Sequence, residues 1–337
     1  MRPRFIIVCI VIAIILSACG AGESAATSTS IPTDTPIIPP IGTATPIIPL
    51  AVLVIPADLD PDTSNLYQKT VYDLAQASGF RFQVLNSLTP ESIEPGLQVV
   101  IALPPDPGIA ALAAAVPQVQ FLAINIPGVS PGGNISVLSG GAQSEIAAFL
   151  AGYTAALTTE DYRIGMIIPK DNPDAIRALN AYANGMKFYC GICPRLFFHQ
   201  WGYPQYVEIS AEEDPANYDA YADILILQYK VGTIYLYPDI AIPDLYTYIG
   251  TTGTSMIGMV SPEQRPAGWI MTIQPDIIKA IQNAWPDLAS GKGGITVQSP
   301  LGLSDIDPSL LSPGKQRLVE QVLNDLQAGL INTGANP

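Results

Sequence analysis

Cys190 and Cys193 are the most specific chemical feature of the chain, because only Gly191 and Ile192 separate them. This spacing occurs in disulfide clips, in redox motifs and in zinc sites. A redox pair needs its first thiol at a helix N-terminus, where the thiol pKa falls, but here the pair follows an expected helix that ends at Tyr189. Zinc needs two further ligands, and none lies nearby in the sequence. The pair therefore predicts a structural disulfide and no metal site.

Groups that could support catalysis are scarce. His199 is the only histidine, and it lies at the end of an expected strand, where a hydrogen-bonded histidine is a simpler interpretation than a catalytic base. No Gly-x-Gly-x-x-Gly or Gly-Lys-Ser/Thr sequence occurs, and Gly291-Lys-Gly-Gly294 precedes an expected strand instead of a helix, as a hinge turn would. A secreted hydrolase is thus a weak alternative. We predict a protein that is not an enzyme and uses no cofactor.

Polar side chains follow several expected strands and aromatic side chains lie at strand ends, and we interpret both groups as candidate ligand-binding residues. In an open parallel sheet, ligands bind beyond the carboxyl ends of the strands, where loops and helix N-termini offer unpaired groups. The polar candidates are Asp58, Asp106, Asn125, Asn172, Asp239 and Glu263. The aromatic candidates are Trp201, Tyr203, Tyr237 and Trp269, any of which could instead be an ordinary packing residue.

The elements that must position these residues are short apolar β-branched runs that alternate with longer helical patterns. The runs are apolar at successive positions, as in parallel strands covered on both faces. Strands are expected over 50–55, 82–85, 99–103, 119–124, 135–138, 163–168, 196–200, 233–237, 256–260, 269–273 and 295–299. The clearest helices are expected over 65–78, 143–157, 174–189, 276–289 and 314–328. So many strands exceed one sheet, and the pattern predicts two Rossmann-like α/β lobes with parallel sheets.

The N-terminus has the three regions of a lipoprotein signal peptide over residues 1–18. Two arginines precede an apolar run, and the run ends in Leu16-Ser-Ala-Cys19, which resembles a bacterial lipobox. The run is about half of the roughly 20 residues that a membrane span requires. We therefore expect Cys19 to be lipidated and the mature protein to be anchored at the outer face of the cell membrane. The alternative is an ordinary secretory signal with an incidental cysteine.

Residues 19–49 predict a disordered tether. From Gly20 to Pro49 the chain has six Pro, six Thr, three Ser and three Gly, and the sequence Thr-Pro-Ile-Ile-Pro occurs twice. Such a segment extends by about 3.1 Å per residue and could hold a domain up to about 90 Å from its anchor.

The chain has a formal charge of −14, and an acidic surface disfavours nucleic acid and anionic headgroups as partners.

Several segments in chain order carry a family resemblance. They are residues 121–125, 134–137, 145–152, 163–168, 183–187, 257–260 and 276–281, followed by Gly291-Lys-Gly-Gly294. With the lipobox, this co-linear set resembles the basic membrane protein family, whose members include nucleoside-binding lipoproteins of ABC importers. The resemblance implies a type I periplasmic binding protein architecture with crossings between lobes near residues 160, 266 and 293. Lobe 1 would comprise 50–160 plus 267–293, and lobe 2 would comprise 161–266 plus 294–337.

The residues that contact ligand in that family transfer only in part. Its first loop usually reads Asp-x-Ser-Phe-Asn-Gln, and residues 62–68 here read Asp-Thr-Ser-Asn-Leu-Tyr-Gln. The resemblance implies ligand contacts by Asp62, Asn65 and Tyr67, with Leu66 in the aromatic place unless Tyr67 substitutes. The later Val-Asp-Ser-Asp-Gln of the family is Val-Ser-Pro-Glu-Gln over residues 260–264, without the carboxylate expected on a ribose hydroxyl.

Residues and resemblance together predict an extracytoplasmic solute-binding lipoprotein. Its partners would be a small polar ligand, which could be a nucleoside, a membrane ABC permease and the lipid bilayer through Cys19. The alternative is a surface sensor or interaction lipoprotein that keeps the same fold without a role in transport.

We predict that Cys19→Ala leaves the protein unlipidated and its domain folded, because a long tether separates the anchor from the domain. Detergent phase partitioning measures the anchoring, and circular dichroism of the same sample checks the fold. Recovery of the variant in the detergent phase would show that another group anchors the chain.

Overall fold

The computed structural model describes residues 47–139, 143–193 and 202–335. Several predicted features lie outside the described residues. They are the signal peptide, Cys19, nearly all of the predicted tether, His199 and the strand expected over 196–200. No helix in these three ranges is long and apolar enough to span a membrane.

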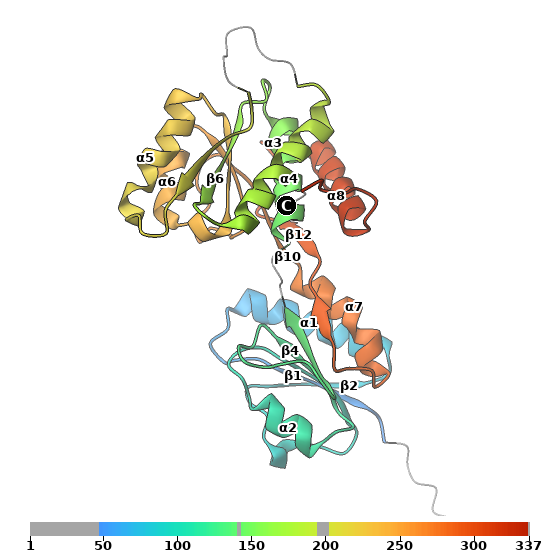
Figure 1. The fold of residues 1–337 in the computed structure, drawn as a ribbon. Helices are drawn as coiled ribbons and strands as arrows, with labels where there is room; N and C mark the ends of the chain where they lie inside the picture. Colours follow the sequence, from blue (N-terminus) through green and yellow to red (C-terminus); the bar gives the residue numbers. More distant parts are fainter. Residues whose placement is uncertain (1–46, 140–142, 194–201, 336–337) are drawn as a thin grey trace, which may run out of the picture. The chain divides into compact units, whose positions relative to one another are not determined.

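The described part of the chain contains two six-stranded sheets (Figure 1). The first has the order β11-β5-β4-β3-β1-β2, with all its pairs parallel. Its strands are β1 (Leu50–Val54), β2 (Arg81–Leu85), β3 (Leu97–Ala102), β4 (Gln120–Ile124), β5 (Ile135–Ser139) and β11 (Thr296–Gln298). The second has the order β12-β10-β9-β8-β6-β7. Its strands are β6 (Ile164–Pro169), β7 (Gln205–Ile209), β8 (Thr233–Leu236), β9 (Ser255–Gly258), β10 (Trp269–Pro275) and β12 (Leu301–Ser304).

Helices cover both faces of each sheet, which is why the strands are apolar at successive positions. In lobe 1, α1 (Pro61–Ala77) and α7 (Ile277–Ala289) pack on one face and α2 (Ile109–Ala115) on the other. In lobe 2, α3 (Ser144–Thr158), α4 (Pro173–Cys190) and α8 (Pro313–Gln327) cover one face. The opposite face carries α5 (Tyr218–Asp223) and α6 (Pro243–Thr251) (Figure 1). The predicted pair of Rossmann-like lobes is confirmed.

The chain changes sheets three times, but not at the predicted positions. It leaves the first sheet after β5, returns between β10 and α7, and leaves again between β11 and β12. Helix α3 and strand β10 therefore belong to lobe 2, and β11 belongs to lobe 1, whereas the crossings predicted near 160, 266 and 293 assigned them the other way. The apolar pattern identified these elements but contains no information about which sheet each one joins.

Other differences concern short or atypical elements. The strand predicted over 196–200 lies outside the described residues, and the first strand described after α4 is β7, which begins at Gln205. Strand β12 was not predicted, and it pairs antiparallel with β10, so the second sheet is not wholly parallel. Helix α1 begins at Pro61, before the predicted start at 65, because Asp60 Oδ2 accepts a hydrogen bond from the Thr63 amide at 2.9 Å and caps it.

Helices α3 and α4 pack with their backbones in contact. A Cβ atom added at Gly152 would lie 2.0 Å from the Tyr182 carbonyl oxygen, and one at Gly185 would lie 1.9 Å from the Phe149 carbonyl oxygen. Helix α3 is buried from Ala147 to Leu157 on all its faces, so it forms the centre of this layer. These two glycines set the distance between the helices.

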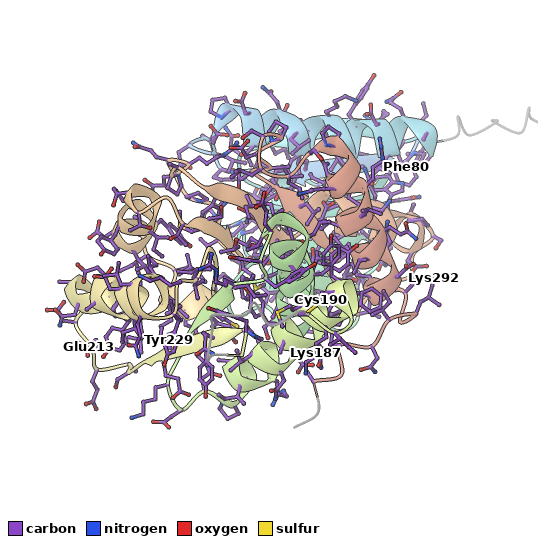
Figure 2. All side chains as sticks on the ribbon, turned by 90° about the horizontal axis from the view of Figure 1, so that it is seen from above. Phe80, Lys187, Cys190, Glu213, Tyr229 and Lys292 are labelled. Atoms are coloured by element: carbon purple, nitrogen blue, oxygen red, sulfur yellow. A yellow bond between two sulfur atoms is a disulfide. The ribbon has the colours of Figure 1, made fainter. Side chains whose placement is uncertain are left out.

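Cys190 and Cys193 form the predicted disulfide, with their Cα atoms 5.1 Å apart (Figure 2). Cys190 is the last residue of α4, so the bridge closes the turn that follows the helix. It is a clip at a helix C-terminus, whereas a redox motif would lie at a helix N-terminus.

We predict that Gly152→Ala and Gly185→Ala each lower the free energy of unfolding by about 1 to 3 kcal/mol or more, because the added methyl group has no space. Urea denaturation followed by circular dichroism measures the change. Gly314→Ala is the matched control, since this glycine of α8 has no atom within 4 Å of an added Cβ, and we expect it to be neutral or slightly stabilising. Equal stability of all three variants would contradict the packing described above.

Candidate functional site

The carboxyl edge of the first sheet holds the polar residues predicted for lobe 1. Asp58 follows β1, Asp106 follows β3 and Asn125 follows β4, and these three strands are neighbours in the sheet. All three side chains are exposed. Asp106 also has a structural task, because its Oδ1 accepts hydrogen bonds from the Gly108 and Ile109 amides, at 3.0 and 2.9 Å, at the start of α2.

Asn125 has a φ of 49°, a left-handed conformation that asparagine tolerates better than most residues. The residue therefore turns the chain directly after β4. Its exposed side chain remains at the sheet edge.

The first turns of α1 contain the residues implied by the family resemblance. Asp62 and Asn65 are exposed on this helix. Tyr67 is half-buried and packs against the lobe 1 core, and burial raises its pKa. Its ring is thus a packing residue and does not replace the missing aromatic. Leu66 is the exposed neighbour, and it lines a pocket of about 310 Å³ with residues 274–278 and 302–304.

The carboxyl edge of the second sheet brings three predicted residues together. Asn172 caps α4 through its Oδ1, which accepts from the Asp174 and Ala175 amides at 3.0 and 3.1 Å. The Nδ2 of the same side chain donates to Asp239 Oδ2 at 3.3 Å. Tyr237, which follows β8, is buried, and burial raises its pKa, with the neighbouring Asp239 and Asp174 adding to the effect.

An ion-pair cluster beside Tyr237 was not predicted. Arg177 Nε donates to Glu145 Oε1 at 2.9 Å, and its guanidinium also pairs with Asp174. The hydrogen bond to Glu145 and the charge of Asp174 raise the Arg177 pKa. These residues line a pocket of about 290 Å³ together with Tyr237 and residues 143, 144 and 146. Glu145 and Arg177 lie on different helices, so sequence spacing gave no signal for the pair.

Two aromatic candidates are corrected by the structure. Trp269 is fully buried in the lobe 2 core, where its Nε1 donates to Thr272 Oγ1 at 3.2 Å and its ring lies edge-on to Tyr246. Tyr203 precedes β7, so it lies at the amino edge of the sheet and not at the carboxyl edge. Trp201 lies outside the described residues. Glu263 is exposed in the loop between β9 and β10.

Gly128-Val-Ser-Pro-Gly132 matches the Gly-x-Ser-x-Gly pattern of serine hydrolases. In those enzymes the serine sits on a sharp turn between a strand and a helix. Here the segment connects β4 to β5, two neighbouring parallel strands, and no helix follows it. The pattern therefore does not form a nucleophile elbow.

A second unpredicted network surrounds Asp305, which follows β12. Its Oδ2 accepts hydrogen bonds from the hydroxyls of Ser261 at 2.5 Å, Thr272 at 2.7 Å and Ser304 at 3.3 Å. Partial burial raises the Asp305 pKa. The hydrogen bonds from these hydroxyls and the charge of Arg265 lower it by more, so the pKa of Asp305 lies below its usual value. The network ties the loop after β9 to the end of β12. Within the three described ranges, no group of His, Cys, Asp and Glu side chains is arranged to hold a metal ion.

Comparison with known proteins places this geometry in a fold class. No protein-family model matches the chain, and no curated protein matches its sequence. A solved ABC transporter solute-binding protein from Conexibacter woesei is similar, with 16% identity and a TM-score of 0.53 over 85% of this chain and 98% of that one. A transcriptional activator of the comK gene from Bacillus halodurans has 12% identity and a TM-score of 0.50 over 83% and 98%. The protein therefore has the fold of type I periplasmic binding proteins.

We predict that Asp305→Asn makes the protein less sensitive to acid. A carboxyl group whose pKa is lower in the folded state than in the unfolded state stabilises the fold when the pH is above the unfolded-state pKa. This contribution disappears as the pH falls through the folded-state pKa. The free energy of unfolding should therefore fall less steeply below about pH 4 in the variant than in the wild type. Urea denaturation at several pH values measures the slope, with Asp219→Asn on the exposed face of α5 as the control. Identical slopes in Asp305→Asn and wild type would show that the network does not lower the pKa.

Proposed function

We propose that this protein is a lipid-anchored, extracytoplasmic solute-binding protein of an ABC importer, related to the basic membrane protein family. The observation that supports the proposal most directly is the placement of polar side chains. In both sheets they gather at the carboxyl edge, which is where open α/β sheets bind ligands. The Conexibacter neighbour is a solute-binding protein, which is consistent with this function.

The groups at the two edges favour a neutral or cationic ligand. Lobe 1 contributes Asp58, Asp62 and Asp106, and lobe 2 contributes Asp239 with the Asn172 amide. Arg177 is already paired with two carboxylates, so an anionic ligand would have to displace them. Carboxylates accept hydrogen bonds from hydroxyl and ammonium groups. We therefore propose a ligand with hydroxyl or amino groups, and a nucleoside is one such molecule.

The lipid anchor rests on Leu16-Ser-Ala-Cys19 and on the Pro-rich segment that follows it. Lipidation at Cys19 would hold the protein at the outer face of the membrane, near a permease. The protein would bind and release its ligand without chemical change, so we propose no enzymatic activity.

The second candidate function is a surface sensor without a role in transport. It is favoured by Leu66, which occupies the position of the family's stacking aromatic, and by Tyr67, which packs into the core. The Bacillus halodurans neighbour is a transcriptional activator, so the same fold also occurs in a regulatory protein. Co-purification with a permease would separate the two functions.

We predict that a thermal-shift screen of nucleosides, sugars and amino acids finds a ligand that raises the melting temperature, because binding to the folded state alone stabilises it. Asp239→Ala should then weaken that ligand by about 1 to 3 kcal/mol in calorimetry, since a desolvated hydrogen bond to a carboxylate is lost. Asp73→Ala, on an exposed residue of α1 that pairs with Lys69, should leave the affinity unchanged. Equal affinities of the Asp239 variant and wild type would remove Asp239 from the site.

A further inference from the structure

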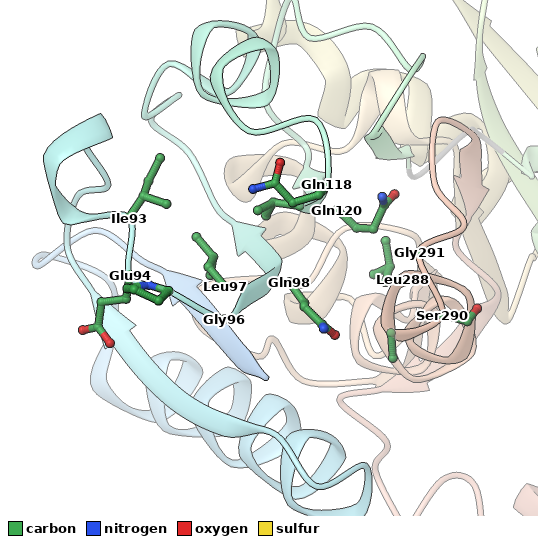
Figure 3. Close-up of a pocket in the computed structure, with 13 residues that line it drawn as sticks. Ile93, Glu94, Gly96, Leu97, Gln98, Gln118, Gln120, Leu288, Ser290 and Gly291 are labelled. Carbon is green, nitrogen blue, oxygen red and sulfur yellow. The ribbon is translucent and has the colours of Figure 1, made fainter. Parts of the chain in front are cut away.

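The amino edge of the first sheet carries a pocket that the proposed function does not use. Its volume is about 680 Å³, and it is bounded by the segment before β3, the start of β4 and the C-terminal end of α7 (Figure 3). Strand β3 is six residues long, so the pocket lies roughly 20 Å from the residues at the carboxyl edge. The two sites are therefore distinct.

Three glutamine side chains give this pocket its polar character. Gln98, Gln118 and Gln120 line it, and Figure 3 shows their amide groups around the cavity. The floor is apolar, since Leu97, Val119 and Leu288 are buried. Glu94 is the one charged residue among those that line the pocket, and it is exposed and paired with Arg81 at 3.5 Å. The lining is thus nearly neutral.

Gln120 is the observation that points to a ligand. Its side chain is only 6% exposed, and its Oε1 has no hydrogen-bond partner among the described residues. The hydroxyl of Ser136, on the neighbouring strand, is also buried without a partner there. Buried polar atoms are normally paired, and of these two residues Gln120 lines the pocket, so a donor bound there would satisfy its amide once the amide turns toward the cavity.

The glycine-rich turn after α7 packs against the buried end of the Gln120 side chain. A Cβ atom at Gly293 would lie 2.1 Å from Gln120 Oε1 and 3.4 Å from the Ser136 hydroxyl oxygen. One at Gly294 would lie 2.4 Å from the Gly133 carbonyl oxygen. Gly291-Lys-Gly-Gly294 is therefore a close-packing turn that lets the backbone approach Gln120 and Ser136.

We propose that this pocket binds a neutral saccharide. Each glutamine amide offers both a donor and an acceptor, which matches adjacent hydroxyl groups on a sugar ring. Ile93, Pro95 and Ala289, which line the pocket and keep exposed surface, would contact the C–H face of the ring. A near-neutral lining does not attract ions, and the volume is in the usual range for small-molecule sites. The terminal amide of Gln120 reaches a bound hydroxyl by rotation about its last torsion, which is soft.

Calorimetry of the full chain with glucose, galactose and N-acetylglucosamine tests the proposal. We expect saturable binding of at least one of these probes. Gln118→Leu and Gln98→Leu should each weaken this binding about tenfold, because each variant loses a hydrogen bond to the sugar. Both side chains are exposed, so neither substitution should disturb the fold. Gln282→Leu is the matched control, since this exposed glutamine of α7 does not line the pocket.

Asp239→Ala distinguishes this pocket from the carboxyl-edge site. Sugar binding that persists in this variant and weakens in Gln118→Leu supports the proposal. Binding that is lost in Asp239→Ala but kept in both glutamine variants would assign the sugar to the other site and overturn it. Absence of saturable binding by all three probes would overturn it as well, and neither result would contradict the proposed solute-binding function.

Discussion

The backbone contact between α3 and α4 is the constraint on which the candidate site of lobe 2 depends. Gly152 and Gly185 bring the two helices so close that the carbonyl oxygens of Tyr182 and Phe149 lie where a Cβ atom of any other residue would need to be. Both helices start at the carboxyl edge of the sheet, and their separation there decides whether Glu145 can reach Arg177. The pocket beside Tyr237 is thus a consequence of packing in the middle of the helices, more than a turn away from the polar groups themselves.

Helix capping and ligand binding share the same edge of each sheet for a geometric reason. The parallel strands β1, β3 and β6 are each followed by a helix whose N-terminus faces that edge, and the free amide groups of that N-terminus need acceptors. Asp60, Asp106 and Asn172 supply those acceptors. A polar residue after a strand is therefore ambiguous in the sequence, because capping and binding favour the same residue types at the same place. Asn172 shows that one side chain can do both: its Oδ1 caps the helix, and its Nδ2 donates a hydrogen bond to Asp239 at the candidate site.

Most of the regular elements could be predicted, and the errors have specific physical causes. Long periodic helices and buried strands have strong patterns, which is why α3, α4, α7 and α8 were placed to within a few residues. Helix α2 and α5 are too short for a clear period, and β12 is an edge strand without a buried run. The position of Trp269 at a strand end predicts a cleft residue, but burial on both sides places its ring in the core.

The amino-acid sequence by itself determined the fold class, the Cys190–Cys193 clip and the candidate polar residues that follow the strands, because these depend on local pattern and spacing. The tertiary structure alone decided which sheet each element joins, which is why α3 and β10 belong to lobe 2 and β11 to lobe 1. It also decided that Glu145 pairs with Arg177 and that Gly293 lies against Gln120. These contacts join residues that are far apart in the chain, and the close packing of backbones that creates them depends on the positions of whole helices and strands, which no local pattern specifies.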